Sequence, residues 1–355
     1  MNARMHECKN LRIIICFHKI YYFRRAYLLR MKKLLTILFV LITFSGKSQI
    51  FEYQVLFEGI GDNREFYNDF GYPQTILGAR GAFETGVKFD NHRLRGGLSQ
   101  LLEFGSDIDA QKPKLTLYYQ FNNEQTEFIF GAFPRRDKID FPLAMLTDTL
   151  LYYRPNIEGF FGKKNWNWGH QNGFIDWISR QTNENREIFT AGSSGEIFLK
   201  NLFLQNYILM THVAQPAIRI PGKSVSDFIG FVLQAGIRTS EKSKFQGYLK
   251  AGILESSHRD RFVSDNFQNS VSLFAEAKGK YKMFGLKSVL SSGDGHSFAY
   301  GDLFYHAKNY LRTDVIWYFI NHEKVKGTFN LSFHVIDWEE LNNQQQLSVI
   351  YVFGK

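Results

Sequence analysis

The stretch IGFVLQAGIR, residues 229–238, carries an apolar side chain at every odd-numbered position, while its even positions hold Gly, Val, Gln, Gly and Arg. The same alternation recurs in LTLYYQF at 115–121, VSLFAEAK at 271–278 and TFNLSFHV at 328–335. Successive side chains of a β-strand point to opposite faces, whereas a helix repeats every 3.6 residues. The alternation therefore predicts strands with one apolar and one polar face.

The connections between such runs come in two lengths. Short turns such as Asn122-Asn123 and Gly279-Lys280 contrast with long loops such as 137–156, as in a membrane barrel with a periplasmic and an external end. Candidate strands fall near residues 75–89, 93–104, 114–121, 126–133, 157–163, 172–180, 186–195, 197–212, 226–238, 245–254, 269–279, 281–291, 302–310, 311–320, 326–337 and 346–353. We therefore expect an all-β chain, a transmembrane antiparallel β-barrel of about 16 strands (14–18), enclosing a water-filled lumen.

The basic charge of the chain is concentrated at its beginning. Of 43 basic and 34 acidic residues, ten basic and one acidic lie within residues 1–48, so the rest is balanced. A balanced body lacks the clustered basic face that binds phosphates, and we expect no nucleic-acid partner. Both cysteines, Cys8 and Cys16, also lie in this stretch, which excludes cysteine chemistry from the remainder.

Residues 31–48, MKKLLTILFVLITFSGKS, have the parts of a secretory signal peptide: two lysines, a short apolar run and a small-residue exit. We expect cleavage after Ser48, so that Gln49 begins the mature chain. Residues 1–30 are interpreted as a leader upstream of the true translation start at Met31. Residues 49–72 are expected to be an irregular N-terminal segment, and residues 73–355 the barrel.

The last strand, LSVIYVF at 347–353, alternates in the same way. With its signal peptide and aromatic body, the chain resembles an outer-membrane β-barrel of the Bacteroidota, broadly porin-like. This resemblance implies an outer-membrane location, contact with lipid, and recognition of the last strand by the barrel-assembly machinery. Gly354 and Lys355 depart from the family pattern, in which an aromatic residue closes the chain.

The function expected from this architecture is passive diffusion of small polar solutes, with no cofactor and no enzymatic activity. Charges on lumen-facing positions would set selectivity, and the candidates are Arg238, Lys250, Glu276 and Lys278. Arg135 and Arg136, at the start of the long loop, could form a basic constriction. Hydrated wall charges without a role in selectivity are the alternative reading.

Tryptophan is concentrated in GKKNWNWGHQNGFIDWISRQ, residues 162–181, which contains Trp166, Trp168 and Trp177. These rings could stack on a sugar, or they could belong to the aromatic girdle at the membrane interfaces. A carbohydrate-binding or structural barrel without an open pore is therefore the alternative function.

An outer-membrane lipid hydrolase is a less favoured alternative. Its candidate residues lie in SSGDGH, where Ser291 and His296 could act as nucleophile and base, although Gly-Asp-Gly is also a turn signal. Asp107 and Asp109 form only a fragment of a Ca²⁺ loop, and His334 has no second ligand at metal spacing, so no metal site is expected. A soluble secreted β-sheet protein is the remaining alternative.

Overall fold

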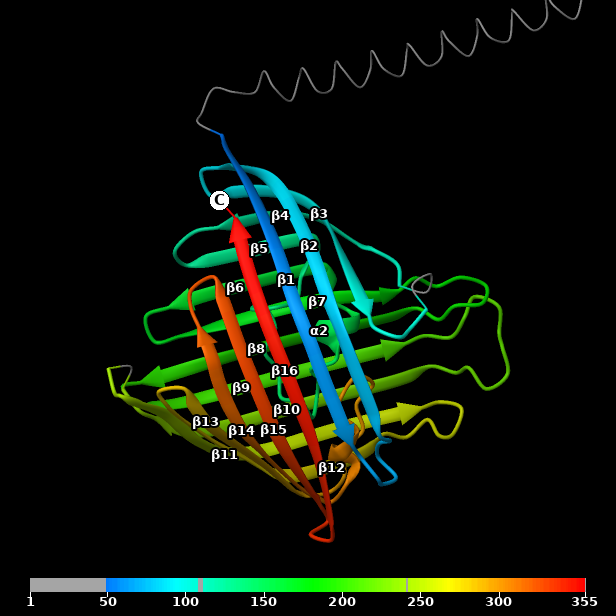
Figure 1. Cartoon of the computed structure of the whole chain (residues 1–355). Coiled ribbons are helices and arrows are strands. Elements are labelled where there is room, and N and C mark those ends of the chain that lie inside the picture. The colour runs from blue at the N-terminus through cyan, green and yellow to red at the C-terminus, as the bar shows by residue number, and fades with distance from the viewer. Residues whose placement is uncertain (1–48, 108–110, 241, 355) are drawn as a thin grey trace, which may run out of the picture. The chain divides into compact units, whose positions relative to one another are not determined.

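A computed structural model describes residues 49–107, 111–240 and 242–354. Sixteen strands form one closed barrel, in which each strand pairs with the next and β1 closes onto β16 (Figure 1). The strands are β1 Ile50–Glu65, β2 Gln74–Phe89, β3 His92–Glu103, β4 Lys114–Asn122, β5 Thr126–Pro134, β6 Asn156–Trp166, β7 Gly169–Ser179, β8 Ile188–Leu199, β9 Leu202–Val213, β10 Ser226–Arg238, β11 Phe245–Asp260, β12 Gln268–Tyr281, β13 Phe284–Gly293, β14 Asn309–Asn321, β15 Val325–Ile336 and β16 Glu340–Gly354. The predicted fold class and strand number are confirmed.

The alternating side chains divide between the lumen and the outer surface. In β10, for example, Val232 and Gln234 are completely buried, whereas Ile229 and Ile237 remain exposed on the other face. An exposed apolar face and a polar inner face are the arrangement that a barrel in lipid requires. None of the helices in the described ranges is long and apolar enough to cross a membrane.

The two rims of the barrel differ in their connections. Short turns, such as residues 90–91 and 282–283, lie at one rim, where β1 begins and β16 ends. Long loops lie at the other rim, as predicted from the sequence. In outer-membrane barrels the short turns face the periplasm and the long loops face outward, so the two rims are called the short-turn rim and the long-loop rim below.

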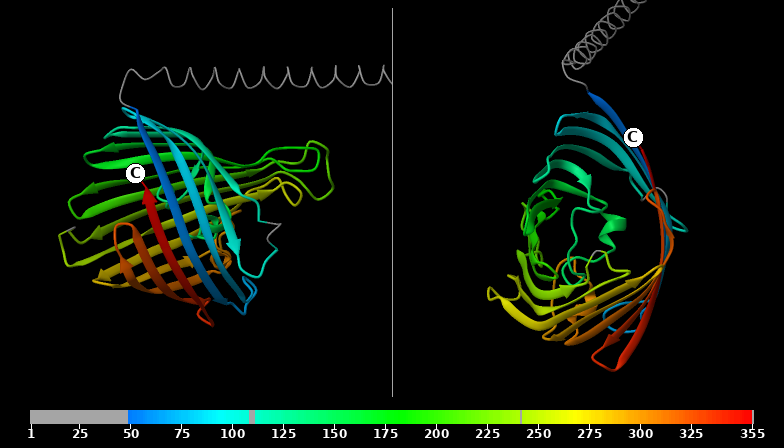
Figure 2. Two further views of the ribbon diagram at one scale, coloured as in Figure 1. Left: turned by 45° about the horizontal axis from the view of Figure 1, so that its top comes forward. Right: turned by 90° about the vertical axis from the view of Figure 1, so that its left-hand side faces the viewer.

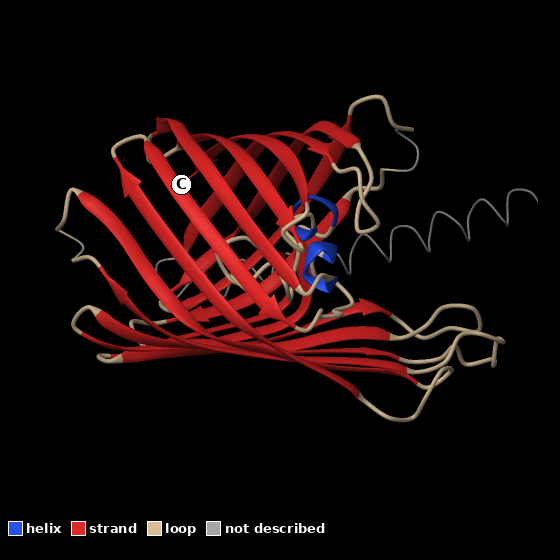
Figure 3. Ribbon diagram, turned by 90° about the horizontal axis from the view of Figure 1, so that it is seen from below, coloured by secondary structure: helices blue, strands red, loops and turns tan. Residues whose placement is uncertain are grey.

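Two of the long loops fold into the lumen instead of leaving the barrel (Figure 2, right). The first, residues 135–155, includes α2 Leu150–Tyr153; the second, residues 294–308, includes the 3-10 helix η2 Leu303–His306. Both short helices are drawn in blue in Figure 3. The loops are joined by backbone hydrogen bonds from Asp302 to Leu143 (2.9 Å) and from Thr147 to Tyr300 (2.8 Å).

The hydrophobic core consequently lies inside the barrel. It combines wall residues such as Phe161 and Phe274 with loop residues such as Met145 and Phe298. Met145 and Phe298, one from each loop, meet the wall at Gly230, where an added Cβ would lie 2.8 Å and 2.2 Å from their atoms. A glycine is required there because the loops pack directly on the backbone of β10.

Two sequence expectations need correction. Residues 49–72 are not irregular, since β1 occupies Ile50–Glu65. Apolar Leu56 and Ile60 on its inner face, and Gly59 and Gly61 on its outer face, interrupt the simple alternation. Residues 302–310 were expected to form a strand but mostly belong to the second inward loop, because their apolar side chains face the core of the lumen. The proposed leader and signal peptide, residues 1–48, lie outside the described residues.

Candidate functional site

Three charged or titratable side chains form a row on the outer surface at the long-loop rim. His212 on β9 lies opposite Asp227 on β10, which in turn lies opposite Arg259 on β11. The ring atom Nδ1 of His212 is 2.7 Å from Oδ1 of Asp227. Arg259 donates from Nη2 to Oδ2 of the same carboxylate at 2.6 Å, and Arg261 approaches it at 3.8 Å. Asp227 and the exposed Ile229 are two residues apart on β10, so their side chains point to the same face of the wall. This row therefore faces away from the lumen.

Aromatic rings extend this row on both sides. Trp177 stacks on Phe189 with ring centroids 5.4 Å apart, and Phe189 lies 5.5 Å from the ring of His212. On the other side, the guanidinium carbon of Arg259 is 4.3 Å from the centroid of Phe267. The term rim cluster is used below for this set: Trp177, Phe189, His212, Asp227, Arg259, Arg261 and Phe267.

The rim cluster combines a base with an anion-binding group. A carboxylate that holds Nδ1 of a histidine fixes its tautomer and leaves Nε2 to take a proton from a nucleophile. Arginines provide donors for an oxyanion or a phosphate. The side chain of His212 is 27% exposed, so it is accessible from outside the barrel.

A second polar group faces outward near the seam between β1 and β16. Asn63 donates to Gln345 (2.6 Å) and to Glu65 (3.1 Å), and the hydroxyl of Thr75 donates to Asn63 (2.7 Å). Tyr67 donates to Glu65 at 2.6 Å. This seam cluster contains no imidazole, and its carboxylate, Glu65, already accepts hydrogen bonds from Asn63 and Tyr67.

The lumen contains Ser291 and His296, which the sequence suggested for a hydrolase, but Ser272 lies between them. His296 contacts the hydroxyl of Ser256 through Nδ1 and that of Ser272 through Nε2, each at 2.8 Å, and Ser272 is 3.0 Å from Ser291. All four residues are at most 3% exposed, and burial lowers the pKa of His296 to about 4. The arrangement attaches the second inward loop to the wall, and its four side chains are shielded from solvent.

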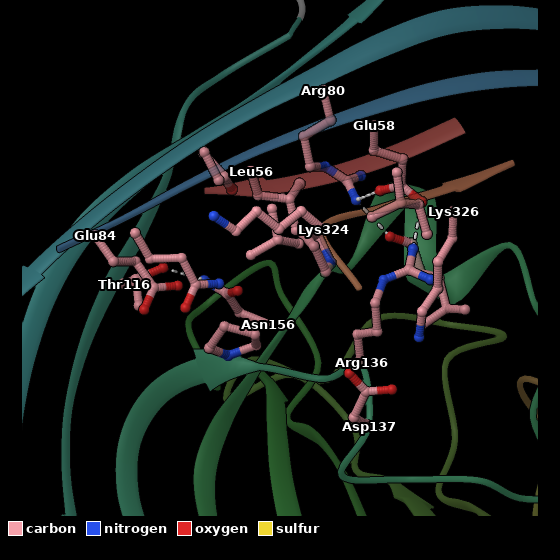
Figure 4. A pocket seen from close by; sticks show the side chains of 18 of the residues that line it. Leu56, Glu58, Arg80, Glu84, Thr116, Arg136, Asp137, Asn156, Lys324 and Lys326 are labelled. Carbon is pink, nitrogen blue, oxygen red and sulfur yellow. Dashed lines mark hydrogen bonds and ion pairs between the residues drawn. The ribbon is translucent and has the colours of Figure 1, made fainter. Parts of the chain in front are cut away.

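Two cavities lie in the lumen beside the inward loops. The first, about 410 Å³, is shown in Figure 4 and contains Arg80, Arg136 and Glu58. Arg136 is paired with Glu58, which Arg80 also contacts at 3.1 Å. Arg135, the other predicted constriction residue, is instead buried against Asp176. The two arginines therefore do not act as one pair, and their role in a constriction stays a prediction.

The second lumen cavity, about 430 Å³, brings together all four predicted wall charges, Arg238, Lys250, Glu276 and Lys278. Lys250 and Glu276 form an ion pair at 3.7 Å, and both are buried. The selectivity role of these residues stays a prediction, but their position on the lumen wall follows directly from the register of β10 to β12.

The three tryptophans do not form one site. Trp166 and Trp168 stack on each other at 5.3 Å beside the short turn that joins β6 to β7, whereas Trp177 belongs to the rim cluster at the opposite rim. All three are more than 40% exposed on the outside of the wall. Positions at the two rims are typical of interfacial aromatic residues.

The remaining sequence candidates lie apart from one another. His334 is buried and bonded to Tyr310 at 2.7 Å. Asp107 lines a third cavity, and Asp109 lies outside the described residues. Among the residues described, no group of three His, Cys, Asp or Glu side chains is placed to hold a metal ion.

Comparison with known proteins gives the family. The family model described as "Lipid A 3'-O-deacylase-type" matches residues 49–353. This chain belongs to that family. The expectation that it has no enzymatic activity is therefore wrong, because the lipid A 3'-O-deacylase-type family is a family of enzymes. No curated protein matches the sequence.

Solved structures support the fold of this deacylase-type chain. A loop-deletion mutant of OmpT, an outer membrane protein of Vibrio cholerae, matches with a TM-score of 0.53 and 10% identity, covering 86% of this chain and 100% of that one. OccK2 (OpdF) of Pseudomonas aeruginosa matches with a TM-score of 0.50 and 10% identity, also covering 86% and 100%. At this identity the likeness shows the fold alone: the chain is a barrel of the outer-membrane type.

Of the rim cluster, sequence reasoning found only Trp177 and missed the charged members, although one signal for them was present. Asp227 precedes Ile229 by two residues, so it continues the odd-numbered apolar series of β10 with a charge. A charge in phase with a lipid-facing series marks the membrane interface or a site on the outer wall. His212 and Arg259 could not be assigned to it without the strand register, which brings residues from three strands together.

Proposed function

We propose that this barrel hydrolyses an ester bond of lipid A, or of a closely related glycolipid, and that the rim cluster is its active site. The observation that carries the proposal is the His212–Asp227 contact, which lies on the outer wall at the long-loop rim. Lipid A is held in the outer leaflet, so its esters would reach this wall by lateral diffusion. Membership of the deacylase-type family supplies the reaction class.

The chemistry assigned to each residue follows from its position. Nε2 of His212 takes a proton from water, whose oxygen attacks the ester carbonyl carbon. Arg259 or Arg261 stabilises the negative charge that develops on the carbonyl oxygen. The tetrahedral intermediate then breaks its bond to the sugar oxygen, which receives the proton from His212. The products are a free fatty acid and a lipid A molecule with one more hydroxyl group.

The aromatic members have a supporting role in the proposal. Trp177 and Phe189 would lie at the level where glycolipid head groups meet the acyl chains, a depth that aromatic side chains favour. Phe267 would support Arg259 by a cation–π contact. Phosphate groups of lipid A would find two arginines in this region.

The experiment is expression of the full chain in a host with fully acylated lipid A, followed by mass spectrometry of the extracted lipid. The proposal predicts a new species lighter by one acyl chain. His212→Gln and Asp227→Asn should reduce its formation by about 10²-fold or more. His92→Gln is the matched control, because His92 also sits on the outer wall but near the turn at residues 90–91, at the short-turn rim.

The outcomes separate the parts of the proposal. Deacylation that persists in both His212→Gln and Asp227→Asn would move the active site elsewhere, with Asn63 and Thr75 of the seam cluster as the next residues to change. A folded wild-type barrel that leaves lipid A unchanged in every host tested would overturn the proposed activity itself.

A diffusion channel is the second candidate function. The observation in its favour is the pair of charged cavities in the lumen, of about 410 and 430 Å³. The inward loops lie beside both cavities and would restrict passage between the rims. Planar-bilayer conductance of the purified barrel tests this function: ohmic steps would support it, and a folded barrel without conductance would contradict it.

A further inference from the structure

Lumen-facing side chains on four consecutive strands form a basic row near the short-turn rim. Arg238 at the end of β10 lies opposite Tyr248 on β11, which lies opposite Lys278 on β12; Lys278 in turn lies opposite Lys287 on β13. All four residues line the second lumen cavity. The name basic row is used below for the three basic residues Arg238, Lys278 and Lys287, together with Tyr248, which lies between the first two.

Nearby carboxylates neutralise only part of this row. Arg238 pairs with Glu196 at 2.8 Å, and Lys287 pairs with Glu276 at 3.4 Å. Within the part of the chain that the structure describes, Lys278 has neither an ion pair nor a hydrogen bond through its side chain. Like charges directly opposite each other on neighbouring strands are destabilising. An anion placed between Lys278 and Lys287 would relieve this repulsion.

The cavity is large enough for a ligand bigger than an inorganic ion. Its volume of about 430 Å³ falls within the range of ligand sites in proteins. Phe203, Tyr207, Tyr248 and Phe274 contribute aromatic rings to its lining, and Asp140 and Gln205 contribute hydrogen-bond acceptors. Aromatic faces beside acceptors and donors are suited to a sugar ring, whose C–H groups stack while its hydroxyl groups form hydrogen bonds.

The position of the cavity determines the side of entry. Arg238 is the last residue of β10 before a turn at the short-turn rim. Toward the other end, the lining includes Phe141, Pro142 and Leu143 from the first inward loop and Tyr305 from the second. Because these loops are hydrogen-bonded to each other, they form a floor, and a ligand would enter from the short-turn rim.

We propose that the second lumen cavity binds a monosaccharide-sized sugar carrying one carboxylate or phosphate, which enters from the periplasmic side. Lys278 and Lys287 hold the anionic group, and the rings of Tyr248 and Tyr207 hold the sugar. The site is separate from the rim cluster, since it lies on the opposite face of the wall and nearer the other rim. It therefore does not depend on the proposed ester hydrolysis.

The test is calorimetric titration of the full chain, purified from outer membranes in detergent, with glucuronate, glucose 6-phosphate, glucose and inorganic phosphate. The two anionic sugars should bind saturably, and more weakly as salt is added. Lys278→Gln should weaken both by about tenfold, the loss expected for one charge-assisted hydrogen bond. Lys163→Gln removes a lysine from β6 that does not line this cavity, and should leave binding unchanged.

Each other outcome would overturn some part of the proposal. Equal binding of glucose would remove the role of the basic row. Equal binding of inorganic phosphate and glucose 6-phosphate would remove the role of the aromatic lining. Unchanged affinity in Lys278→Gln, in a variant that still runs as a folded, heat-modifiable barrel, would place any binding outside this cavity.

Discussion

The backbone N–H of Asp302 donates to the carbonyl of Leu143 at 2.9 Å, which joins two loops that leave the wall on different sides of the barrel. Leu143 follows β5, and Asp302 follows β13. The first loop is further attached to β16, where Gln346 donates to Asp148 at 3.0 Å. The lumen of this barrel is thus occupied by a connected polypeptide layer.

Gly301 sits at the contact between the two loops, and we expect Gly301→Ala to loosen it. An added Cβ would lie 2.1 Å from the carbonyl oxygen of Ala144, so one backbone must move. Overpacking of this kind costs about 1–3 kcal/mol. The expected result is faster proteolysis of residues 135–155 in the folded barrel and a higher single-barrel conductance. Gly162→Ala, at a position with nothing within 4 Å of the added atom, is the control.

The activity of His212 as a base should depend on Asp227, which contacts its ring atom Nδ1. Asp227→Asn keeps the size of the side chain but removes the charge that fixes His212 at 2.7 Å. We expect a fall in the rate of deacylation of about 10²-fold or more.

The two arginines of the rim cluster should contribute unequally to the rate. Arg261→Ala, which removes the more distant arginine, should lower the rate of deacylation less than Arg259→Ala. Mass spectrometry of lipid A at several times after induction measures these rates, and equal rates in all variants would contradict the assignment.

Protonation of His296 should weaken the contact that this residue makes between the second inward loop and the wall. The pKa of His296 is about 4 in the folded chain because of burial, against an ordinary value of 6.5. Between pH 6.5 and 4 the unfolded chain therefore binds more protons, and the stabilising contribution of neutral His296 is lost as the pH falls through this window. The full loss is on the order of 3 kcal/mol.

Asp302 in the same loop titrates in the opposite sense, since loss of hydration raises its pKa from 3.8 to about 6. A raised carboxyl pKa favours the folded state below pH 3.8 and loses that contribution as the pH rises through 6. Comparison of urea unfolding in wild type and His296→Gln isolates the histidine. The variant should lose less stability between pH 6.5 and 4 than wild type, and parallel curves would contradict the role of His296.

Arg135→Ala should destabilise the barrel more than it changes ion selectivity. Arg135 is 5% exposed and paired with Asp176, which is 1% exposed, so the substitution leaves a buried carboxylate. Arg154 remains 3.6 Å from that carboxylate, and we expect a loss of about 3 kcal/mol, at the lower end for a broken buried pair. Arg136→Ala should cost less, because Glu58 keeps its contact with Arg80. Urea unfolding and bilayer reversal potentials measure the two effects.

The sequence was sufficient for the strands β2 to β16 because the wall faces two different solvents. Wherever lipid meets one face and a polar lumen the other, as in residues 229–238, alternation is visible residue by residue. β1 was missed because apolar Leu56 and Ile60 lie on its inner face while Gly59 and Gly61 lie on its outer face, which breaks the alternation of apolar and polar residues. Residues 302–310 were misread because an apolar loop packed in a lumen resembles an apolar strand.

The candidate sites were predictable only where the alternation along a strand determines which face of the wall a side chain points to. This alternation was enough to assign four charged residues to the lumen wall, and all four line one cavity: Arg238, Lys250, Glu276 and Lys278. It gave no indication that Arg135 and Arg136 would separate, since that depends on distant partners, Asp176 and Glu58. The neighbours of His212 were likewise hidden, because Asp227 and Arg259 meet it only through the register of three strands.

The joined loops also have a mechanical consequence for the wall around them. Here the loops reach β10 at Gly230 and β2 at Arg80, which donates to the carbonyl of Leu151 at 2.6 Å. They therefore form a continuous connection through the lumen between β10 and β2, which are separated by seven strands along the wall. Asp227 of the rim cluster also lies on β10, three residues before Gly230, and is thus close to the point where the wall is supported from inside.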